Sequence, residues 1–173
     1  MVFSFHTAID QRAMTAMARA LRKTVRKKRS RRSHIFGWIV IVAGLLLAFG
    51  GEDGFVVDVR TAATLLVLLV IVVVLVWEDQ VNAYIARKRM LPGTEKATSC
   101  FEPDGYKTTT DIGETSWHYD KIGRLVIIGD YYVFVFNQSH AQVYDRRSIS
   151  GGTTGEFEKF IESKTEKNFQ MIR

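Results

Sequence analysis

Cysteine and proline are scarce in this chain of 173 residues, which has one cysteine and two prolines. Cys100 has no partner, so an internal disulfide and a cluster of thiolate metal ligands are both excluded. The four histidines show no metal-ligand spacing either, so we expect no metal and no other cofactor. A lone thiol is easiest to accommodate in a reducing compartment.

Acidic residues are almost missing from residues 1–34, which hold ten Lys and Arg and one Asp. The net charge of +6 is concentrated there, because residues 97–173 hold nine basic and eleven acidic side chains. The C-terminal region therefore lacks the basic surface that binds nucleic acid. The basic segment alone also fits a nucleic-acid-binding arm, but the apolar run that follows it directly favours a membrane instead.

Charged residues are absent from two long apolar runs. Residues 61–77, TAATLLVLLVIVVVLVW, are 17 uncharged residues. Strands usually run about 4 to 8 residues, whereas a helix of that length rises about 25 Å, close to the thickness of the hydrocarbon core. We therefore predict a transmembrane helix over 61–77. A shorter run predicts another over 35–51, with Trp38 at the interface.

The first apolar run also has features of a cleaved signal peptide, because Ala48-Phe49-Gly50 resembles a small-x-small cleavage site. A basic segment of 34 residues before the run is far longer than the usual leader region, which favours a retained helix. Gly37, Gly44 and Ala48 share one side of that helix and predict a close approach of another helix.

The distribution of Lys and Arg predicts the orientation. Ten basic residues precede the first span, Arg60 alone lies between the spans, and Arg87, Lys88 and Arg89 follow the second. Basic clusters stay on the cytoplasmic side, so we expect a helical hairpin in the plasma membrane with both termini cytoplasmic and residues 52–60 as an external loop.

The basic segment has helical periodicity, with Met14, Met17, Leu21 and Val25 on one side. It is consistent with a helix lying on anionic lipid headgroups and equally with a solvated helix packed on the cytosolic domain. The candidate headgroup-binding residues are Arg22, Lys23, Arg26, Lys27, Lys28, Arg29, Arg31 and Arg32.

The remaining segments predict a cytosolic α+β domain. Residues 78–93 continue the second span as a helix for about three turns, until Pro92 and Gly93 form a linker. Residues 94–173 then alternate as strands, beginning with a hairpin around Pro103-Asp104-Gly105, and end in an amphipathic helix that starts at Thr153. The run Val133 to Phe136 is apolar on both sides, as in a central strand.

The first seven residues, MVFSFHT, alternate as a strand does, with Phe3 and Phe5 on one side. If both termini are cytosolic, this strand completes the sheet of the distant C-terminal domain. The two spans are then an insertion within one domain.

The C-terminal region resembles a family of bacterial membrane proteins, the YcxB-like family. The matching residues are Phe101, Asp104, Gly105 and Tyr106, then Thr115 to Ile122, Asp130 to Phe136 and Gly155 to Ile161. The resemblance covers about residues 98–165, and the two preceding spans fit the family's layout. It implies a pleckstrin-homology-like (PH-like) domain, a bent antiparallel sheet closed by a C-terminal helix, and it carries no catalytic site.

No arrangement of residues predicts an enzyme or a small-molecule substrate. Ser116, His118 and Asp120 lie side by side on one strand, about 7 Å apart, whereas triad members converge from separate segments. The GGTTG segment lacks the lysine of a phosphate-binding loop and predicts a capped turn. We expect a non-enzymatic binding or regulatory module that engages a protein partner or another copy of itself, with anionic-lipid sensing as the alternative.

Overall fold

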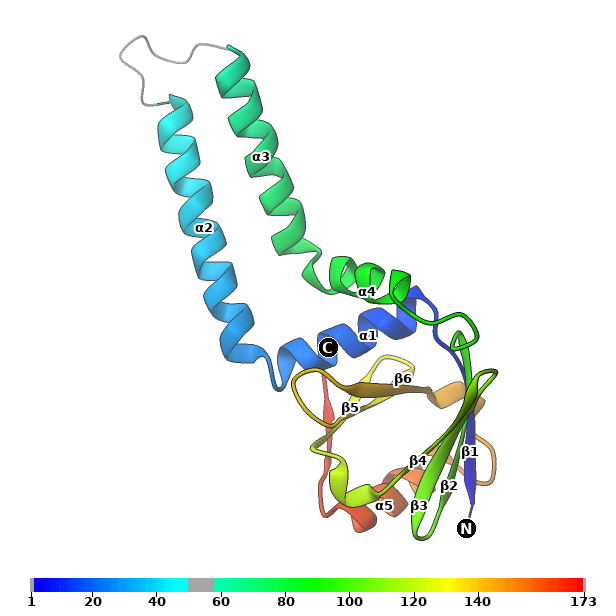
Figure 1. The fold of residues 1–173 in the computed structure, drawn as a ribbon. Helices are drawn as coiled ribbons and strands as arrows, with labels where there is room; N and C mark the ends of the chain where they lie inside the picture. The colour runs from blue at the N-terminus through cyan, green and yellow to red at the C-terminus, as the bar shows by residue number, and fades with distance from the viewer. Residues whose placement is uncertain (1, 50–57, 173) are drawn as a thin grey trace.

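The computed structural model describes residues 2–49 and 58–172, and it shows two long helices projecting from a β-rich domain (Figure 1). The helices are α1 (Gln11–Lys23), α2 (Lys27–Phe49), α3 (Val59–Val76), α4 (Glu78–Lys88) and α5 (Thr154–Thr165), with short 3-10 turns η1 (Tyr119–Lys121) and η2 (Arg146–Ser148). The strands are β1 (Phe3–Ala8), β2 (Lys96–Glu102), β3 (Gly105–Thr110), β4 (Gly113–Trp117), β5 (Arg124–Ile128), β6 (Tyr131–Val135), β7 (Ala141–Asp145) and β8 (Phe169–Met171).

The domain contains two four-stranded sheets. The first sheet, β1-β2-β3-β4, is antiparallel, and the second has the order β7-β6-β5-β8. In the second sheet β8 runs parallel to β5, so this sheet is mixed. The expectation of a single antiparallel sheet ended by a helix therefore needs correction. A short strand follows α5, and the sequence pattern indicated neither β5 nor β8.

The N-terminal strand joins the C-terminal domain, as predicted. It pairs antiparallel with β2, from Phe3 opposite Phe101 to Ala8 opposite Lys96. It also contacts the second sheet, because the backbone N–H of Asp145 in β7 donates to Thr7 Oγ1 at 3.1 Å. Just after β7, Ser4 and Ser150 exchange backbone hydrogen bonds of 3.0 and 2.9 Å. The helical hairpin is thus inserted between two parts of one domain.

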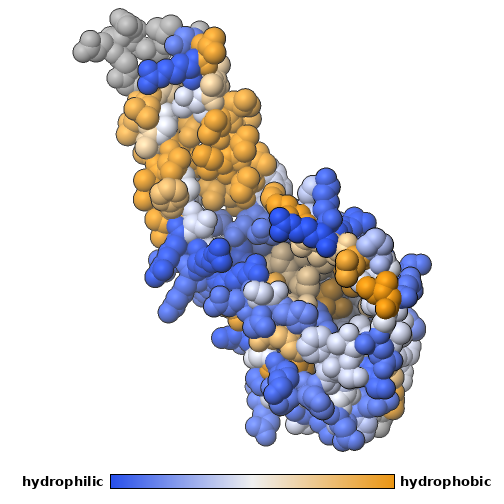
Figure 2. Space-filling view, in the orientation of Figure 1, coloured by the Kyte–Doolittle hydropathy of each residue, from blue (hydrophilic) through white to orange (hydrophobic). Residues whose placement is uncertain are grey.

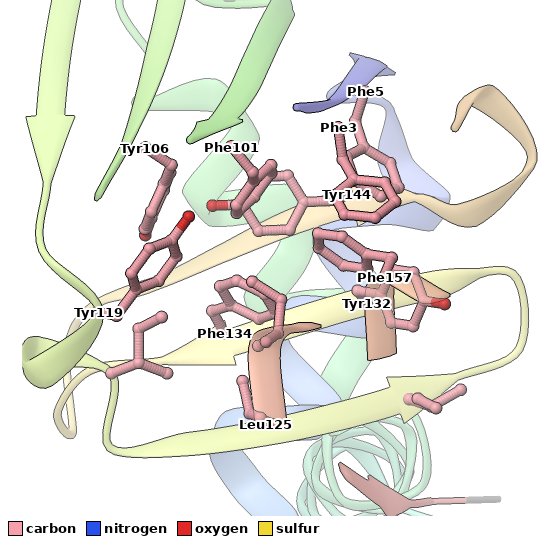
Figure 3. Close-up of a cluster of buried hydrophobic side chains, with 13 residues drawn as sticks. Phe3, Phe5, Phe101, Tyr106, Tyr119, Leu125, Tyr132, Phe134, Tyr144 and Phe157 are labelled. Atoms are coloured by element: carbon pink, nitrogen blue, oxygen red, sulfur yellow. The ribbon is translucent and has the colours of Figure 1, made fainter. Parts of the chain in front are cut away.

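The main core lies between the two sheets and is closed by α5 (Figure 3). Phe3 and Phe5 from β1 are fully buried there, with Phe5 against Phe157 of α5 at a ring-centroid distance of 4.7 Å. Figure 3 shows Phe101, Tyr144 and Phe134 pointing toward the same centre. Two tyrosine hydroxyls, those of Tyr106 and Tyr144, donate to Gln142 Oε1, and burial raises the pKa of Tyr144 well above its ordinary value.

A second apolar cluster covers the opposite face of the second sheet. There α1 places small and aliphatic side chains, among them Ala13, Ala20 and Leu21, against Val126 and Val133. Both faces of β6 are therefore buried, which confirms the prediction of a central strand. Because α1 also covers this face, the basic segment serves the domain as a packing element.

The hairpin consists of α2 and α3, and both helices are long and apolar enough to cross a membrane. They meet at small residues, since a Cβ on Gly37 would lie 2.8 Å from Leu75 and one on Gly44 would lie 2.7 Å from Leu68. This confirms the predicted close approach at these two glycines. The outer surface of the hairpin is apolar (Figure 2), and Leu46 and Leu47 are 68% and 75% exposed. Residues 50–51 at the end of the predicted first span and residues 52–57 of the predicted external loop lie outside the described residues.

The helix boundaries differ from the expected ones in three places. Helix α3 begins at Val59, within the predicted loop of residues 52–60 and two residues before the predicted span. The sequence predicts a span that begins at residue 35, but α2 begins at Lys27 and includes the end of the basic run, because no helix breaker separates the two. A break comes earlier, at residues 24–26, where Thr24 caps α1. At the other end, the predicted second span and its predicted cytosolic extension form two separate helices, α3 and α4, since Trp77 leaves the helical conformation at φ −105° and ψ 29°.

Candidate anion-binding groove

The break between α1 and α2, at residues 24–26, forms one end of a groove. Thr24 ends α1 by donating from both its backbone N–H and its hydroxyl to the carbonyl of Ala20, at 3.0 and 2.6 Å. Arg26 then fixes the turn to the β6–β7 loop, because its Nε donates to the carbonyl of Gln138 at 2.6 Å. The first turns of α2 consequently stand beside the end of the second sheet.

The groove has a volume of about 830 Å³ and lies between the start of α2, the start of β5 and the β6–β7 loop. Six of its lining side chains are basic and none is acidic: Arg26, Lys27, Lys28, Arg29, Arg32 and Arg124. The remaining lining residues are Thr24, Val25, Asn137 and Gln138. Figure 2 shows the hydrophilic surface at the base of the apolar hairpin.

The positive charge of the groove is not neutralised within the described part of the chain. None of its six basic side chains takes part in an ion pair among residues 2–49 and 58–172. Asn137 orders the loop, because its Oδ1 accepts from the backbone N–H groups of Ser139 and His140 at 2.8 and 2.9 Å. Such a concave, unpaired basic surface attracts anions, and arginine and lysine are the usual ligands of phosphate.

The structure gathers five of the predicted headgroup residues, Arg26 to Arg29 and Arg32, in this groove. Lys23 and Arg31 are exposed but do not line it. Arg22 has a different role, because its Nε and Nη2 donate to the two carboxylate oxygens of Asp79, both at 2.6 Å. This hydrogen bonding raises the pKa of Arg22, and the residue is removed from the candidate set.

Arg124 is the groove residue that the sequence did not indicate. It is an isolated basic residue at the start of β5, about ninety positions from the basic run, and no local pattern points to it. Its place in the groove follows from the packing of α1 on the second sheet. Only tertiary structure brings these segments together.

A polar junction beside the groove connects the domain to the hairpin. Asp79 is 4% exposed and also accepts from Arg19 Nε at 3.4 Å, so one carboxylate at the start of α4 ties two arginines of α1. The neighbouring Glu78 accepts from Ser30 Oγ of α2 at 2.9 Å and lies 2.7 Å from His34 Nε2. The sequence showed these acidic residues directly after an apolar run, but not their partners.

The arrangements weighed for catalysis do not come together. No hydrogen bond among the described residues joins Ser116, His118 and Asp120, and the last pairs with Lys121 at 2.9 Å. The GGTTG segment forms the predicted capped turn, in which Thr153 and Glu156 make a reciprocal capping box at the start of α5. Among the described residues, no cluster of His, Cys, Asp and Glu fits a metal ion.

No protein family, curated protein or solved structure matches the chain. The groove, the hairpin and the fold of the domain are therefore the features of this chain that bear on its function.

Proposed function

We propose that the chain is an integral membrane protein whose cytosolic domain binds anionic lipid headgroups in the groove between α2 and β5. It acts as a non-enzymatic binding or regulatory module. The observation that carries this proposal is the gathering of six basic side chains, none of which forms an ion pair with a described residue, at the base of an apolar hairpin.

The depth of the groove supports a lipid ligand. The apolar run of α2 begins at Ile35, while Lys27 and Arg32 lie eight and three residues before it in the same helix. At about 1.5 Å per residue along the helix axis, the backbone positions of Lys27 and Arg32 lie about 12 and 5 Å from the start of the apolar run. The headgroup layer is about 5 to 8 Å thick on each side of the hydrocarbon core, so Arg32 starts within this layer and Lys27 starts just outside it.

The orientation follows the distribution of charge. The basic residues lie in α1, in the first turns of α2 and at the end of α4, and this distribution favours a cytoplasmic location for both termini and for the domain. A cytoplasmic leaflet that contains anionic lipid carries a negative surface potential. The groove would then face its ligand directly.

The fold of the domain supports a PH-like assignment. Four antiparallel strands, three further antiparallel strands and a helix that closes the core follow one another along the chain, apart from the inserted hairpin and the added β8. This order agrees with the bent sheet and C-terminal helix that the YcxB-like resemblance implies. We propose on this basis that the chain is a YcxB-like protein with a PH-like domain.

Binding of fluorescent phosphatidylglycerol to the purified full-length protein in neutral detergent tests the groove. The triple variant Lys28→Ala, Arg32→Ala, Arg124→Ala should bind about 100-fold more weakly, because each basic residue contributes about 1 kcal/mol at an anionic surface. Added salt should weaken binding by the wild type, and phosphatidylcholine should bind poorly to both proteins.

A matched control removes the same charge elsewhere. The variant Lys107→Ala, Lys121→Ala, Lys159→Ala changes three exposed lysines outside the groove and should bind as the wild type does. Equal weakening in the two triple variants would show that net charge alone attracts the lipid, and the groove assignment would be wrong.

A protein partner or a second copy is the second candidate ligand, and one observation favours it. Strand β4 pairs with β3 along one edge, and no described strand pairs with its other edge. An unpaired edge can accept an added strand. Crosslinking from a photoreactive residue at Ser116 would detect such a partner, whereas a label that reacts only with lipid or water would count against it.

A further inference from the structure

Helix α4 leaves the direction of α3 and runs over α1, on the side of the domain that faces the hairpin (Figure 1). The change of direction occurs at Trp77, which has no side-chain cap and belongs to neither helix. Since α3 ends at Val76, α4 begins at the level where the apolar hairpin ends. The described structure therefore places α4 between the hairpin and the rest of the domain.

The two faces of α4 differ in what they contact. Asp79 and Ala83, one turn apart, are 4% and 1% exposed and pack toward α1. On a helical wheel the opposite face carries Val81, Ile85 and Lys88, with Tyr84 at its border. Tyr84 and Ile85 are 53% and 43% exposed, and Trp77 before them is 47% exposed.

The residue types on this outer face are those of a membrane–water interface. Tryptophan and tyrosine concentrate at the headgroup level, where an apolar ring and a polar group are both accommodated. Lys88 places its ammonium 4.8 Å from the centre of the Tyr84 ring, next to Arg87 and Arg89. Apolar side chains flanked by basic ones are typical of helices that lie in the plane of an anionic bilayer.

We infer that α4 lies in the membrane–water interface, with Trp77, Val81, Tyr84 and Ile85 inserted at the boundary between headgroups and acyl chains. The occupant of this face is the lipid surface that surrounds the end of α3, because the apolar outer face continues directly from the hairpin. The inference depends on the membrane insertion proposed above but not on the groove. It adds a second contact with the bilayer.

As a consequence, the orientation of the domain relative to the membrane is fixed. Asp79 on the inner face binds Arg22 and Arg19 of α1, so an α4 held in the interface also holds α1 and the second sheet beneath it. The start of α2 is connected to α4 through Glu78 and Ser30. The basic groove is thereby kept at the depth of the headgroups.

Depth-dependent quenching in the full-length protein tests the inference. In a Cys100→Ser background, single cysteines at position 85 on the outer face and position 80 on the side toward the domain are labelled with the fluorophore NBD. The proteins are reconstituted in vesicles of phosphatidylcholine and phosphatidylglycerol that contain lipids with a nitroxide at acyl carbon 5 or 12. Position 70, which is exposed on α3, and position 121, which is exposed on the domain, serve as bilayer and water references.

We expect Ile85→Cys to be quenched at least twofold more by the shallow nitroxide than by the deep one, and Gln80→Cys to resemble Lys121→Cys. If Val70→Cys is quenched but Ile85→Cys is not, α4 lies in water and the inference is wrong while membrane insertion stands. If Val70→Cys is not quenched either, both proposals are overturned. A blue-shifted, unquenched label at position 85 whose emission depends on protein density would assign this face to a second copy and also overturn the inference.

Discussion

At the scale of single residues, Gly151 is the position where the two ends of the domain meet. Its backbone has a positive φ of 90°, a conformation that residues other than glycine rarely adopt. A Cβ on this residue would also lie 2.0 Å from the carbonyl oxygen of Val2. No side chain fits there unless the N-terminal strand moves.

The first prediction compares two glycines close together in the chain. Gly151→Ala should lower the free energy of unfolding by at least about 2 kcal/mol, because it adds left-handed strain and pushes Val2 away. Gly155→Ala should raise it by about 0.5 kcal/mol, because Gly155 lies in α5 and its Cβ would meet nothing within 4 Å. Urea unfolding in detergent measures both. Equal effects of the two substitutions would contradict the predicted close approach at Gly151.

The sequence predicted which residues of the domain are buried better than it predicted which polar side chains contact one another. The alternation of Phe3 and Phe5 against polar neighbours was sufficient to predict one buried face, and both are fully buried. The partners of Asp79 were not predictable, since an acidic residue after a span has many possible arginine partners along the chain. For the same reason the sequence placed Arg22 among the candidate headgroup residues and did not indicate Asp79 as its partner.

At the scale of elements, the local sequence pattern predicted the two apolar helices, from the length of their uncharged runs, and also the β2–β3 hairpin, β6 and α5. It failed where a segment was short or where its neighbours decide its state. Strand β8 has three residues and exists because β5 offers it an edge. The break at residues 24–26 is likewise stabilised by a distant contact, between Arg26 and the carbonyl of Gln138, which no local pattern encodes.

The second prediction concerns the packing of α2 against α3. Gly44→Leu should push the helices apart without preventing insertion, because a Cβ at this position already overlaps the side chain of Leu68. Crosslinking of cysteines at positions 40 and 71, which line the same interhelical groove, should fall severalfold in a Cys100→Ser background. Ala62→Leu places the same side chain at an exposed position and should leave crosslinking unchanged. Unaltered crosslinking in Gly44→Leu would show that this face does not hold the spans together.

At the scale of the whole molecule, the helical hairpin interrupts a domain whose first strand and first helix precede it. The sequence predicted the strand's place because both termini were expected on one side of the membrane. It did not decide the position of α1, because the pattern was equally consistent with packing on the domain and with a position on lipid headgroups. The structure shows the packing, so the main core and the α1 cluster both combine residues from the two sides of the hairpin.

The third prediction is that the domain folds without its hairpin when both of its parts are present. Residues 94–173 alone should aggregate, because they lack the buried Phe3 and Phe5 and expose the apolar face that α1 covers. Residues 1–26 joined to residues 94–173 by a flexible linker should melt cooperatively and stay soluble. The face of α1 that loses α4 carries Arg19 and Arg22, which tolerate water.

Two further fusion proteins separate the contributions of β1 and α1 to the stability of this joined domain. Fusing only the first seven residues should give a weaker and broader melt than fusing residues 1–26, because Val126 and Val133 remain uncovered. Phe3→Ser, Phe5→Ser in the longer fusion should abolish the cooperative transition, since truncating a buried Phe costs about 3 to 5 kcal/mol and a whole domain has about 5 to 15. Calorimetry compares the sharpness of the melting transition in four proteins: residues 94–173 alone, the two fusions, and the double variant of the longer fusion. If residues 94–173 alone melt as sharply as the longer fusion, the N-terminal strand and helix are dispensable, and the hairpin does not interrupt a single folding unit.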